Sequence, residues 1–206
     1  MSDESTPLPV NHHGDHPGFS GLTGSLCAWI FLLTGRDSGK LAADLTRVGP
    51  ADRVVDIGCG AGNAVREAAR RGARATGVDP SSSMLRVARA VTRRRTAVTW
   101  SQGTAEALPA PDGTASVVWA LATVHHWRDV DAALVEIHRV LAPGGRLLAV
   151  EKQSEPGATG FASHGWTGEQ AETFAALCRS TGLIDVHVRG DRAGRREVWA
   201  VSAAKP

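Results

Sequence analysis

The sequence has no tyrosine and only three cysteines, and aromatic residues make up just 5% of its 206 residues. Cys27, Cys59 and Cys178 are an odd number, lie far apart and form no CxxC pair. The sequence therefore favours neither a disulfide framework nor a structural zinc site. This cysteine usage is typical of a reducing compartment, and we expect a cytoplasmic protein.

Long apolar runs and an excess of one charge are also missing. The longest apolar run, Leu26–Leu33, is much shorter than the roughly 20 residues of a membrane-spanning helix. The opening residues lack the basic region and apolar stretch of a signal peptide. Because 23 basic residues face 21 acidic ones, no strong basic field attracts nucleic acid or an anionic membrane. We expect a protein that binds neither, and its oligomeric state stays open.

The N-terminal segment differs in composition from the rest of the chain. Residues 1–20 are rich in Pro, Ser, Gly, Asp and His and have no apolar period, which indicates a flexible arm. Residues 21–206 are long enough for a single domain. The arm carries His12, His13 and His16, but its glycines and prolines cannot hold a rigid ligand set, so we assign no metal ligands.

Short apolar, β-branched runs alternate with amphipathic segments along the remaining chain. The expected strands are residues 53–57, 75–79, 97–101, 115–121, 146–150, 183–188 and 197–202. The expected helices are residues 22–33, 38–48, 62–71, one capped by Ser81, one capped by Asp131 and 167–181. This order predicts an α/β fold with a doubly wound, Rossmann-like seven-stranded sheet and helices on both faces. The turn GDRAG predicts a final hairpin, so that only the last strand is antiparallel.

The strongest motif is VVDIGCGAGNA, residues 54–64, in which a strand runs into a glycine-rich turn and then a helix. Gly58, Gly60 and Gly62 allow a tight turn and close approach of a ligand to the backbone. Asp79 ends the next strand, where a carboxylate can accept ribose hydroxyls. Asp56 precedes the glycines, where a carboxylate can meet a cationic ligand. The spacing is GxGxG, unlike the GxGxxG of dinucleotide binders.

Five blocks in order resemble the class I S-adenosylmethionine-dependent methyltransferases, specifically the type 11 subgroup. The blocks are VVDIGCGAGNA, GVDPSSSML, GTAEALP, SVVWALATVHHW and EIHRVLAPGGRLLAVE. The resemblance covers residues of about 50 to 151. One departure is Thr104, which stands where the family usually has an aspartate, and a charge-assisted contact is lost there.

The resemblance implies a role for each matching position. The methionine end of S-adenosylmethionine is contacted by Asp56, the backbone of Gly58, Cys59 and Gly60, and the carbonyl of Leu121. The ribose is contacted by Asp79. The adenine is contacted by Pro80, Ser81, Met84, Thr104 and Ala105. His125 and His126 face the acceptor, either as a general base or as a wall of the pocket.

The sequence thus predicts an enzyme that moves the methyl group of S-adenosylmethionine to an O, N, S or C nucleophile of a small molecule, leaving S-adenosylhomocysteine. The first 45 or so residues and the loop over residues 152–166 are expected to form the acceptor wall. Two alternatives remain. The chain could be a binding protein for S-adenosylmethionine without catalysis, or a nicotinamide-dependent oxidoreductase on the same sheet.

Overall fold

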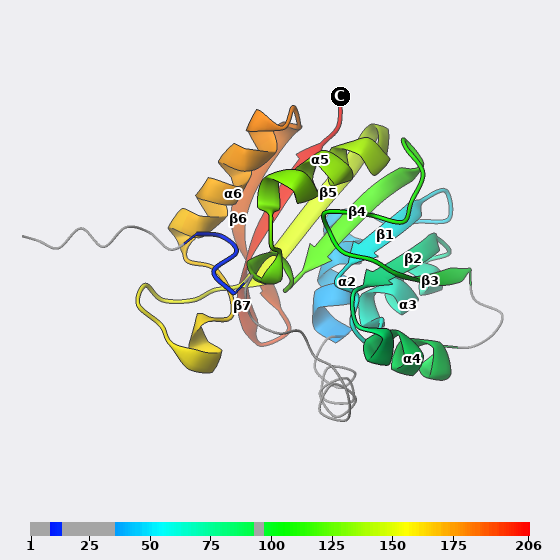
Figure 1. Ribbon diagram of the computed structural model, residues 1–206, viewed down its shortest axis with the longest axis horizontal. Coiled ribbons are helices and arrows are strands. Elements are labelled where there is room, and N and C mark those ends of the chain that lie inside the picture. Colours follow the sequence, from blue (N-terminus) through cyan, green and yellow to red (C-terminus); the bar gives the residue numbers. More distant parts are fainter. Residues whose placement is uncertain (1–8, 14–35, 93–96) are drawn as a thin grey trace, which may run out of the picture.

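The computed structural model describes residues 9–13, 36–92 and 97–206. They form a seven-stranded sheet in the order β3-β2-β1-β4-β5-β7-β6 (Figure 1). The strands are β1 (Arg53–Ile57), β2 (Arg74–Asp79), β3 (Val98–Gln102), β4 (Ala115–Leu121), β5 (Leu141–Lys152), β6 (Ile184–Ala193) and β7 (Arg196–Ala204). The helices are α2 (Arg36–Leu45), α3 (Asn63–Arg70), α4 (Ser82–Val91), α5 (Val130–Val140) and α6 (Gly168–Ser180), with short 3-10 helices η1 (Val124–His126) and η2 (Gly160–Ser163).

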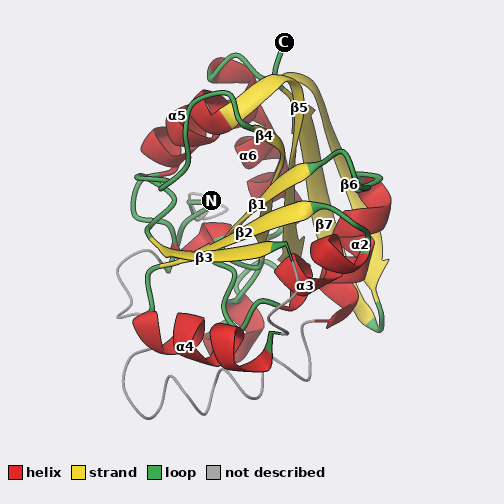
Figure 2. Ribbon diagram, turned by 90° about the vertical axis from the view of Figure 1, so that its right-hand side faces the viewer, coloured by secondary structure: helices red, strands yellow, loops and turns green. Residues whose placement is uncertain are grey.

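The sheet is parallel from β3 to β5, and β7 is antiparallel to both of its neighbours, β5 and β6. The prediction of a seven-stranded sheet with only the last strand antiparallel is therefore confirmed. Figure 2 shows the strong twist of this sheet, with β1 to β3 crossing the direction of β5 to β7.

Each face of the sheet has its own apolar core, because successive strand residues point to opposite faces. Val55 and Val118 belong to the core beneath α5 and α6, which also contains the fully buried Trp166 and Phe174. Their strand neighbours, Val54 and Trp119 among them, belong to the core beneath α2 and α3. The result is a three-layer arrangement with helices on both faces (Figure 1).

Several predicted boundaries are wrong, among them those of α2, which spans Arg36–Leu45 and not residues 38–48. Helix α5 is capped by Asp129, whose carboxylate accepts a hydrogen bond from the Ala132 N–H at 2.9 Å, and not by Asp131. Strand β5 begins at Leu141, five residues early, because Leu141 pairs with Ala115 before an irregularity that takes up the Pro-Gly-Gly segment. Strand β6 continues through most of the expected turn, and the hairpin closes in two residues after Ala193.

Several expectations fall on residues that the structure does not describe. The helix expected over residues 22–33, with Cys27, lies outside the described residues, as does His16. Of the expected arm, residues 9–13 are described. Among the helices of the described part, none combines the length and apolar character needed to cross a bilayer.

Candidate active site

Four parallel strands end side by side at one edge of the sheet. Ile57 at the end of β1 pairs with Val78 of β2 and with Ala120 of β4, and Asp79 pairs with Gln102 at the end of β3. In open α/β sheets, ligands bind in the crevice beyond these carboxyl ends. The predicted site residues from the first four blocks lie at this edge or directly after it.

The glycine turn that follows β1 has positive φ angles that only glycine adopts freely. Gly58, Gly60 and Gly62 have φ values of 67°, 53° and 79°. A Cβ at Gly58 would overlap the side chain of Thr123, and one at Gly62 would overlap the indole of Trp100. At Gly60 a Cβ would meet nothing within 4 Å, so open space borders the backbone there.

Two buried carboxyl groups flank this turn. Asp79 accepts a hydrogen bond from the Gly60 N–H at 2.8 Å through one oxygen and from the Ser81 N–H at 2.8 Å through the other. Burial raises the pKa of Asp79, against the lowering effect of these two hydrogen bonds. Burial and then the charge of Asp79 raise the pKa of Asp56 to about 8. A buried acid of this kind is stabilised as a carboxylate by a bound cation.

Cys59 lies inside the same turn but is no reactive nucleophile. Its side chain is buried, and its N–H donates to the carbonyl of Val78 at 3.0 Å. Burial, followed by the charges of Asp56 and Asp79, raises the pKa of its thiol. A thiol that resists ionisation is a poor nucleophile. Cys59 therefore suits this turn by the small size of its side chain and not by its reactivity.

The residues expected near an adenine occupy the adjoining loops. Met84 is buried in α4 against Ala61 of the glycine turn. Ala105 is buried in the loop after β3, and Thr104 beside it is exposed. The hydroxyl of Thr104 bonds to Glu106 and helps to lower the pKa of that carboxyl group. The exposed Pro80 directly follows Asp79, and the half-buried Leu121 ends β4.

The segment after β4 is a 3-10 helix. In an extended segment His125 and His126 would point to opposite faces, and here they do not. The two rings lie together in η1, with centroids 4.1 Å apart. The bend begins at Ala122, whose φ of 54° is unusual for a residue with a side chain. Thr123 follows and packs on Gly58, which joins η1 to the glycine turn.

His125 is held by Glu151 near the end of β5. The His125 ring Nδ1 lies 2.8 Å from one Glu151 oxygen, and the Val124 N–H donates to the other at 2.8 Å. Glu151 and His125 are 1% and 3% exposed. Because a carboxylate only accepts, Nδ1 of His125 donates, and in the neutral ring it is Nε2 that carries the lone pair. Burial and the neighbouring histidines lower the pKa of His126 to about 4, so this imidazole is neutral near pH 7.

Residues 9–13, here called the strap, lie across the histidines and the loop before α6. The His13 N–H donates to the carbonyl of His125 at 2.9 Å, and the indole N–H of Trp166 donates to the carbonyl of Val10 at 2.9 Å. Further bonds join Asn11 to Trp127, His12 to Ser163 and Gln170 to Pro9. The strap and the loop that carries His164 therefore both lie beside the histidines of η1.

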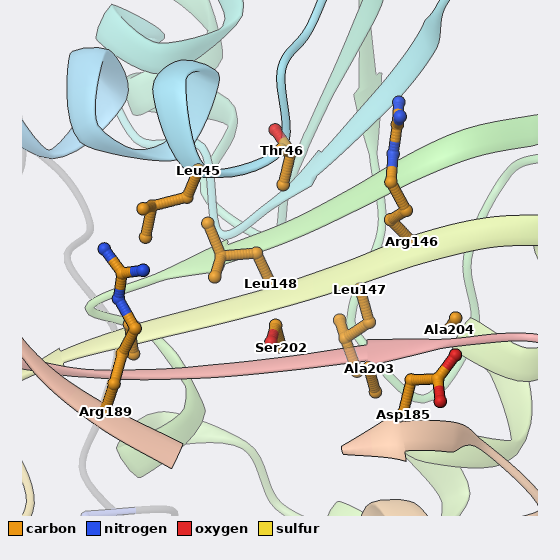
Figure 3. Close-up of a pocket in the computed structure, with 11 residues that line it drawn as sticks. Leu45, Thr46, Arg146, Leu147, Leu148, Asp185, Arg189, Ser202, Ala203 and Ala204 are labelled. Carbon is orange, nitrogen blue, oxygen red and sulfur yellow. The ribbon is translucent and has the colours of Figure 1, made fainter. Parts of the chain in front are cut away.

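A cavity of about 220 Å³ lies elsewhere, over the sheet between α2 and the β5–β7–β6 region (Figure 3). Leu45 and Thr46 lie on one side of it, and Arg189 on another. Its β5 lining, Arg146 to Leu148, comes from well before the carboxyl end of that strand. The cavity is thus separate from the glycine turn and the histidines.

The family comparison matches this geometry. The sequence profile described as a methyltransferase domain, of the type 11 group, matches residues 55–149, which span β1 to the latter part of β5. The matched part of the chain, residues 55–149, belongs to the class I S-adenosylmethionine-dependent methyltransferases. The matched segment contains all of the predicted site residues of this methyltransferase domain. Glu151, which was not predicted as a site residue, lies two residues beyond it.

Relatives and solved structures agree with this assignment. The malonyl-[acyl-carrier protein] O-methyltransferase of Serratia marcescens is 34% identical over 139 residues, covering 68% of this chain and 52% of the relative. A chain from the complex of the Haloferax volcanii Trm112 activator with a putative methyltransferase has a TM-score of 0.72 at 22% identity, covering 89% and 97%. Haemonchus contortus phosphoethanolamine N-methyltransferase 2 also has a TM-score of 0.72, at 20% identity, covering 97% and 60%. This chain spans about half the length, or less, of the curated relatives that it matches first.

Sequence reasoning missed the residues that surround the methyltransferase domain's histidines. Glu151 closes the apolar run LLAVE, and a charged residue at the end of a buried strand is the signal that could have found it. Thr123 and Trp100 fill the space left by two glycines, a pairing that no local pattern carries. His164 lies in a loop far along the chain and joins His125 and His126 only in the fold.

Proposed function

We propose that this methyltransferase domain transfers the methyl group of S-adenosylmethionine to a nucleophilic atom of a small molecule that binds beside His125. The observation that carries the proposal is the contact between the two parts of this sheet edge, the glycine turn after β1 and the histidines of η1 after β4. Thr123 packs on Gly58, so the glycine turn and the histidines of η1 form one continuous surface. A donor on the first half and an acceptor on the second are then neighbours, which is the main requirement of a methyl transfer.

The chain's residues fit the donor by their chemistry. S-adenosylmethionine supplies a methyl group on a positively charged sulfur, which makes that carbon a ready electrophile. The Asp56 carboxylate can pair with the ligand's ammonium group, and the open backbone at Gly60 leaves room for its methionine end. The Asp79 oxygens, each with a lone pair beyond its backbone bond, can accept the ribose hydroxyls.

In this proposal the loops after β2 and β3 bind the adenine. We assign it to Pro80, Met84, Thr104 and Ala105, and we assign an ammonium contact to the Leu121 carbonyl. Thr104 already bonds to Glu106. Its hydroxyl therefore supplies a weaker adenine contact than the aspartate usual in the family.

Of the two histidines, we assign the role of proton acceptor to His125. Glu151 binds its Nδ1–H and leaves the Nε2 lone pair to take a proton from the acceptor. His126, with its pKa lowered to about 4, binds a proton poorly near pH 7 and serves as a wall of the acceptor pocket. Glu151 acts as a positioning residue that holds the imidazole and stabilises its protonated form.

The test is release of S-adenosylhomocysteine with a panel of small acceptors that carry hydroxyl, thiol, amine or acidic C–H groups. We expect turnover with at least one acceptor class. His125→Ala should lower kcat by about 10²–10⁴-fold while the affinity for S-adenosylmethionine stays almost unchanged. His187→Ala, on the exposed surface of β6, is the matched control and should retain full activity.

Two outcomes would favour the alternatives. Binding of S-adenosylmethionine by calorimetry without turnover on any acceptor would indicate a non-catalytic binding protein. A thermal shift caused by NAD and not by S-adenosylmethionine would indicate an oxidoreductase. Full activity of His125→Ala with an unchanged pH profile would remove the base from the mechanism.

A further inference from the structure

Three imidazoles from two distant segments meet at the acceptor side of the site. His125 and His126 come from η1, and His164 comes from the loop just after η2. One ligand nitrogen from each lies within 4.8 Å of the other two. The ring centroid of His164 lies 5.5 Å from that of His125 and 5.6 Å from that of His126. Metal-binding side chains from separate segments that converge in this way are typical of a metal centre.

Glu151 prepares one of these imidazoles for a metal ion. In metal centres, a ligating histidine almost always donates its second ring N–H to a carboxylate or a carbonyl, which fixes the ring and its tautomer. His125 has this arrangement, because its Nδ1 lies 2.8 Å from Glu151, which leaves Nε2 as the ligand atom of the neutral ring. The carboxylate is itself held by the Val124 N–H at 2.8 Å.

The loop that carries His164 is tied down at its base. Trp166 donates its backbone N–H to the carbonyl of Lys152 at 2.8 Å and accepts the Ser154 N–H at 2.8 Å. Gly165, between His164 and Trp166, has a φ of 152°, and a Cβ there would overlap the Lys152 carbonyl. This tight turn directs the chain back over the end of β5, so His164 is brought to η1 by the fold.

We propose that His125, His126 and His164 bind one divalent transition-metal ion of the zinc class, with Glu151 as the outer partner of His125. Imidazole nitrogens suit Zn²⁺, Cu²⁺ and Ni²⁺, whereas Mg²⁺ and Ca²⁺ prefer oxygen ligands. Zinc–nitrogen distances of about 2.0–2.1 Å place ligand atoms about 3.3 Å apart in a tetrahedral site. The three nitrogens must therefore close by at most about 1.5 Å, a distance that side-chain rotation can cover. Three protein ligands leave a further position for water or another ligand.

The strap packs on the cluster through His13, and its other histidine, His12, bonds elsewhere. The ring of His13 stacks on that of His164, with centroids 4.3 Å apart and an interplanar angle of 14°. His12 uses both ring nitrogens on the protein, at 2.7 Å from the Ser163 carbonyl and 3.2 Å from the Gln170 amide. We therefore exclude His12 from the ligand set.

An effect of this ion on methyl transfer rests on the proposed function. Nε2 of His125 cannot bind a metal ion and accept a proton at the same time. Zinc added to an active, metal-free enzyme should therefore lower turnover, and a chelator should restore it. Ion binding itself is measured without any acceptor, so the two proposals fail separately. If zinc binds and turnover rises, the metal site stands and the proton-acceptor role of His125 is overturned.

The experiment uses the full chain without an added histidine tag, freed of metal by a chelator. Zn²⁺ is titrated by calorimetry, and Co²⁺ is titrated by its visible absorption, which reports the coordination geometry. We expect one ion per chain and a tetrahedral or five-coordinate Co²⁺ spectrum. Glu151→Gln should weaken binding by about 10–100-fold, and His164→Ala should weaken it further.

Two controls separate this site from other histidines. His187→Ala should bind Zn²⁺ as the unaltered chain does, and so should His12→Ala. Circular dichroism and thermal unfolding of each metal-free variant report whether it is folded. The proposal is overturned if the unaltered chain binds no stoichiometric ion, if folded His164→Ala binds as tightly as the unaltered chain, or if His12→Ala alone abolishes binding. If His164→Ala does not fold, the folded Glu151→Gln variant is used, and its affinity for Zn²⁺ is measured by competition with Co²⁺. A Zn²⁺ affinity equal to that of the unaltered chain overturns the proposal.

Discussion

Asp56 and Asp79 are two carboxyl groups buried at the ends of neighbouring strands. Burial disfavours the charged form of each, and the charge of Asp79 further disfavours that of Asp56. The cost of burying the Asp79 charge is partly offset by hydrogen bonds from two backbone N–H groups. The main electrostatic change on binding a cationic ligand should therefore occur at Asp56.

The first prediction is that S-adenosylmethionine binding releases a proton from Asp56. With its pKa raised to about 8, this group is protonated in the free protein below pH 8 and must ionise to pair with the ligand. Affinity should rise with pH between about pH 5.5 and 7, by up to about tenfold per unit. Calorimetry in buffers of different ionisation enthalpy measures the released proton. Asp56→Asn should bind more weakly and without this pH dependence, and an unchanged slope in that variant would contradict the assignment.

The second prediction separates backbone strain from steric overlap in the glycine turn. Gly58→Ala places a Cβ into Thr123, whereas Gly113→Ala meets nothing within 4 Å at a similar φ of 62°. Both variants should lose about 1–2 kcal/mol from the positive φ, and Gly58→Ala should lose more and should lose ligand binding as well. Urea unfolding and calorimetry measure both effects. Equal losses of stability with intact binding would show that the Thr123 contact does not matter.

At the scale of elements, the sequence predicted which segments are helices and strands better than it predicted where they end. Strands β1 and β4 match their predicted ranges, because β-branched runs bounded by glycine or polar residues mark both ends. Strand β5 begins early because pairing with Ala115 outweighs the expected stop at Pro143. The 3-10 helix η1 carries no periodic signal, since three residues are too few for one.

The third prediction concerns the capping box of α6. The Thr167 hydroxyl accepts the Gln170 N–H at 3.3 Å, and the Gln170 side chain accepts the Thr167 N–H at 2.9 Å. Thr167→Ala should lower the free energy of unfolding by about 1 kcal/mol. Thr173→Ala, on the exposed face of the same helix, is the matched control and should be neutral or slightly stabilising, because alanine favours a helix interior. Equal losses in urea unfolding would contradict a capping role.

The fourth prediction concerns the strap as a whole segment. It is attached through backbone and side-chain hydrogen bonds to η1, to the loop before α6 and to α6 itself. If it closes over the acceptor, amide hydrogen exchange in residues 9–13 should slow when S-adenosylhomocysteine and an acceptor are both bound. S-adenosylhomocysteine alone should have a smaller effect. Exchange that ignores both ligands would exclude a covering role.

At the scale of the whole molecule, the sequence predicted the sheet because strands that alternate with helices favour a parallel sheet. The edge that carries the candidate site followed from a second rule, that ligands bind beyond the carboxyl ends of parallel strands. The meeting of His125 with Glu151 and His164 could not be predicted. It depends on the register of β4 against β5 and on one loop turn at Gly165, and neither leaves a local pattern.

The fifth prediction is a pH dependence of stability in the ligand-free protein. The folded-state pKa of Asp56 lies above its unfolded value, so the folded chain binds the extra proton and its stability falls as pH rises from about 4 toward 8. Glu67 and Glu136 have lowered pKa values and contribute the opposite trend at acid pH. The stability of Asp56→Asn relative to the unaltered chain should therefore increase from pH 5 to pH 8. Urea unfolding at both pH values measures the difference, and a constant difference would contradict burial of an ionising Asp56.

The position of β7 has a consequence for the order in which the chain can fold during synthesis. β7 follows β6 in the sequence but lies between β5 and β6 in the sheet, paired to both. Until β7 leaves the ribosome, β5 presents an unpaired edge and β6 has no neighbour in the sheet. Open edges of this kind pair readily with other chains. We therefore expect the nascent chain to be most exposed to aggregation when its sheet lacks only the strand between β5 and β6.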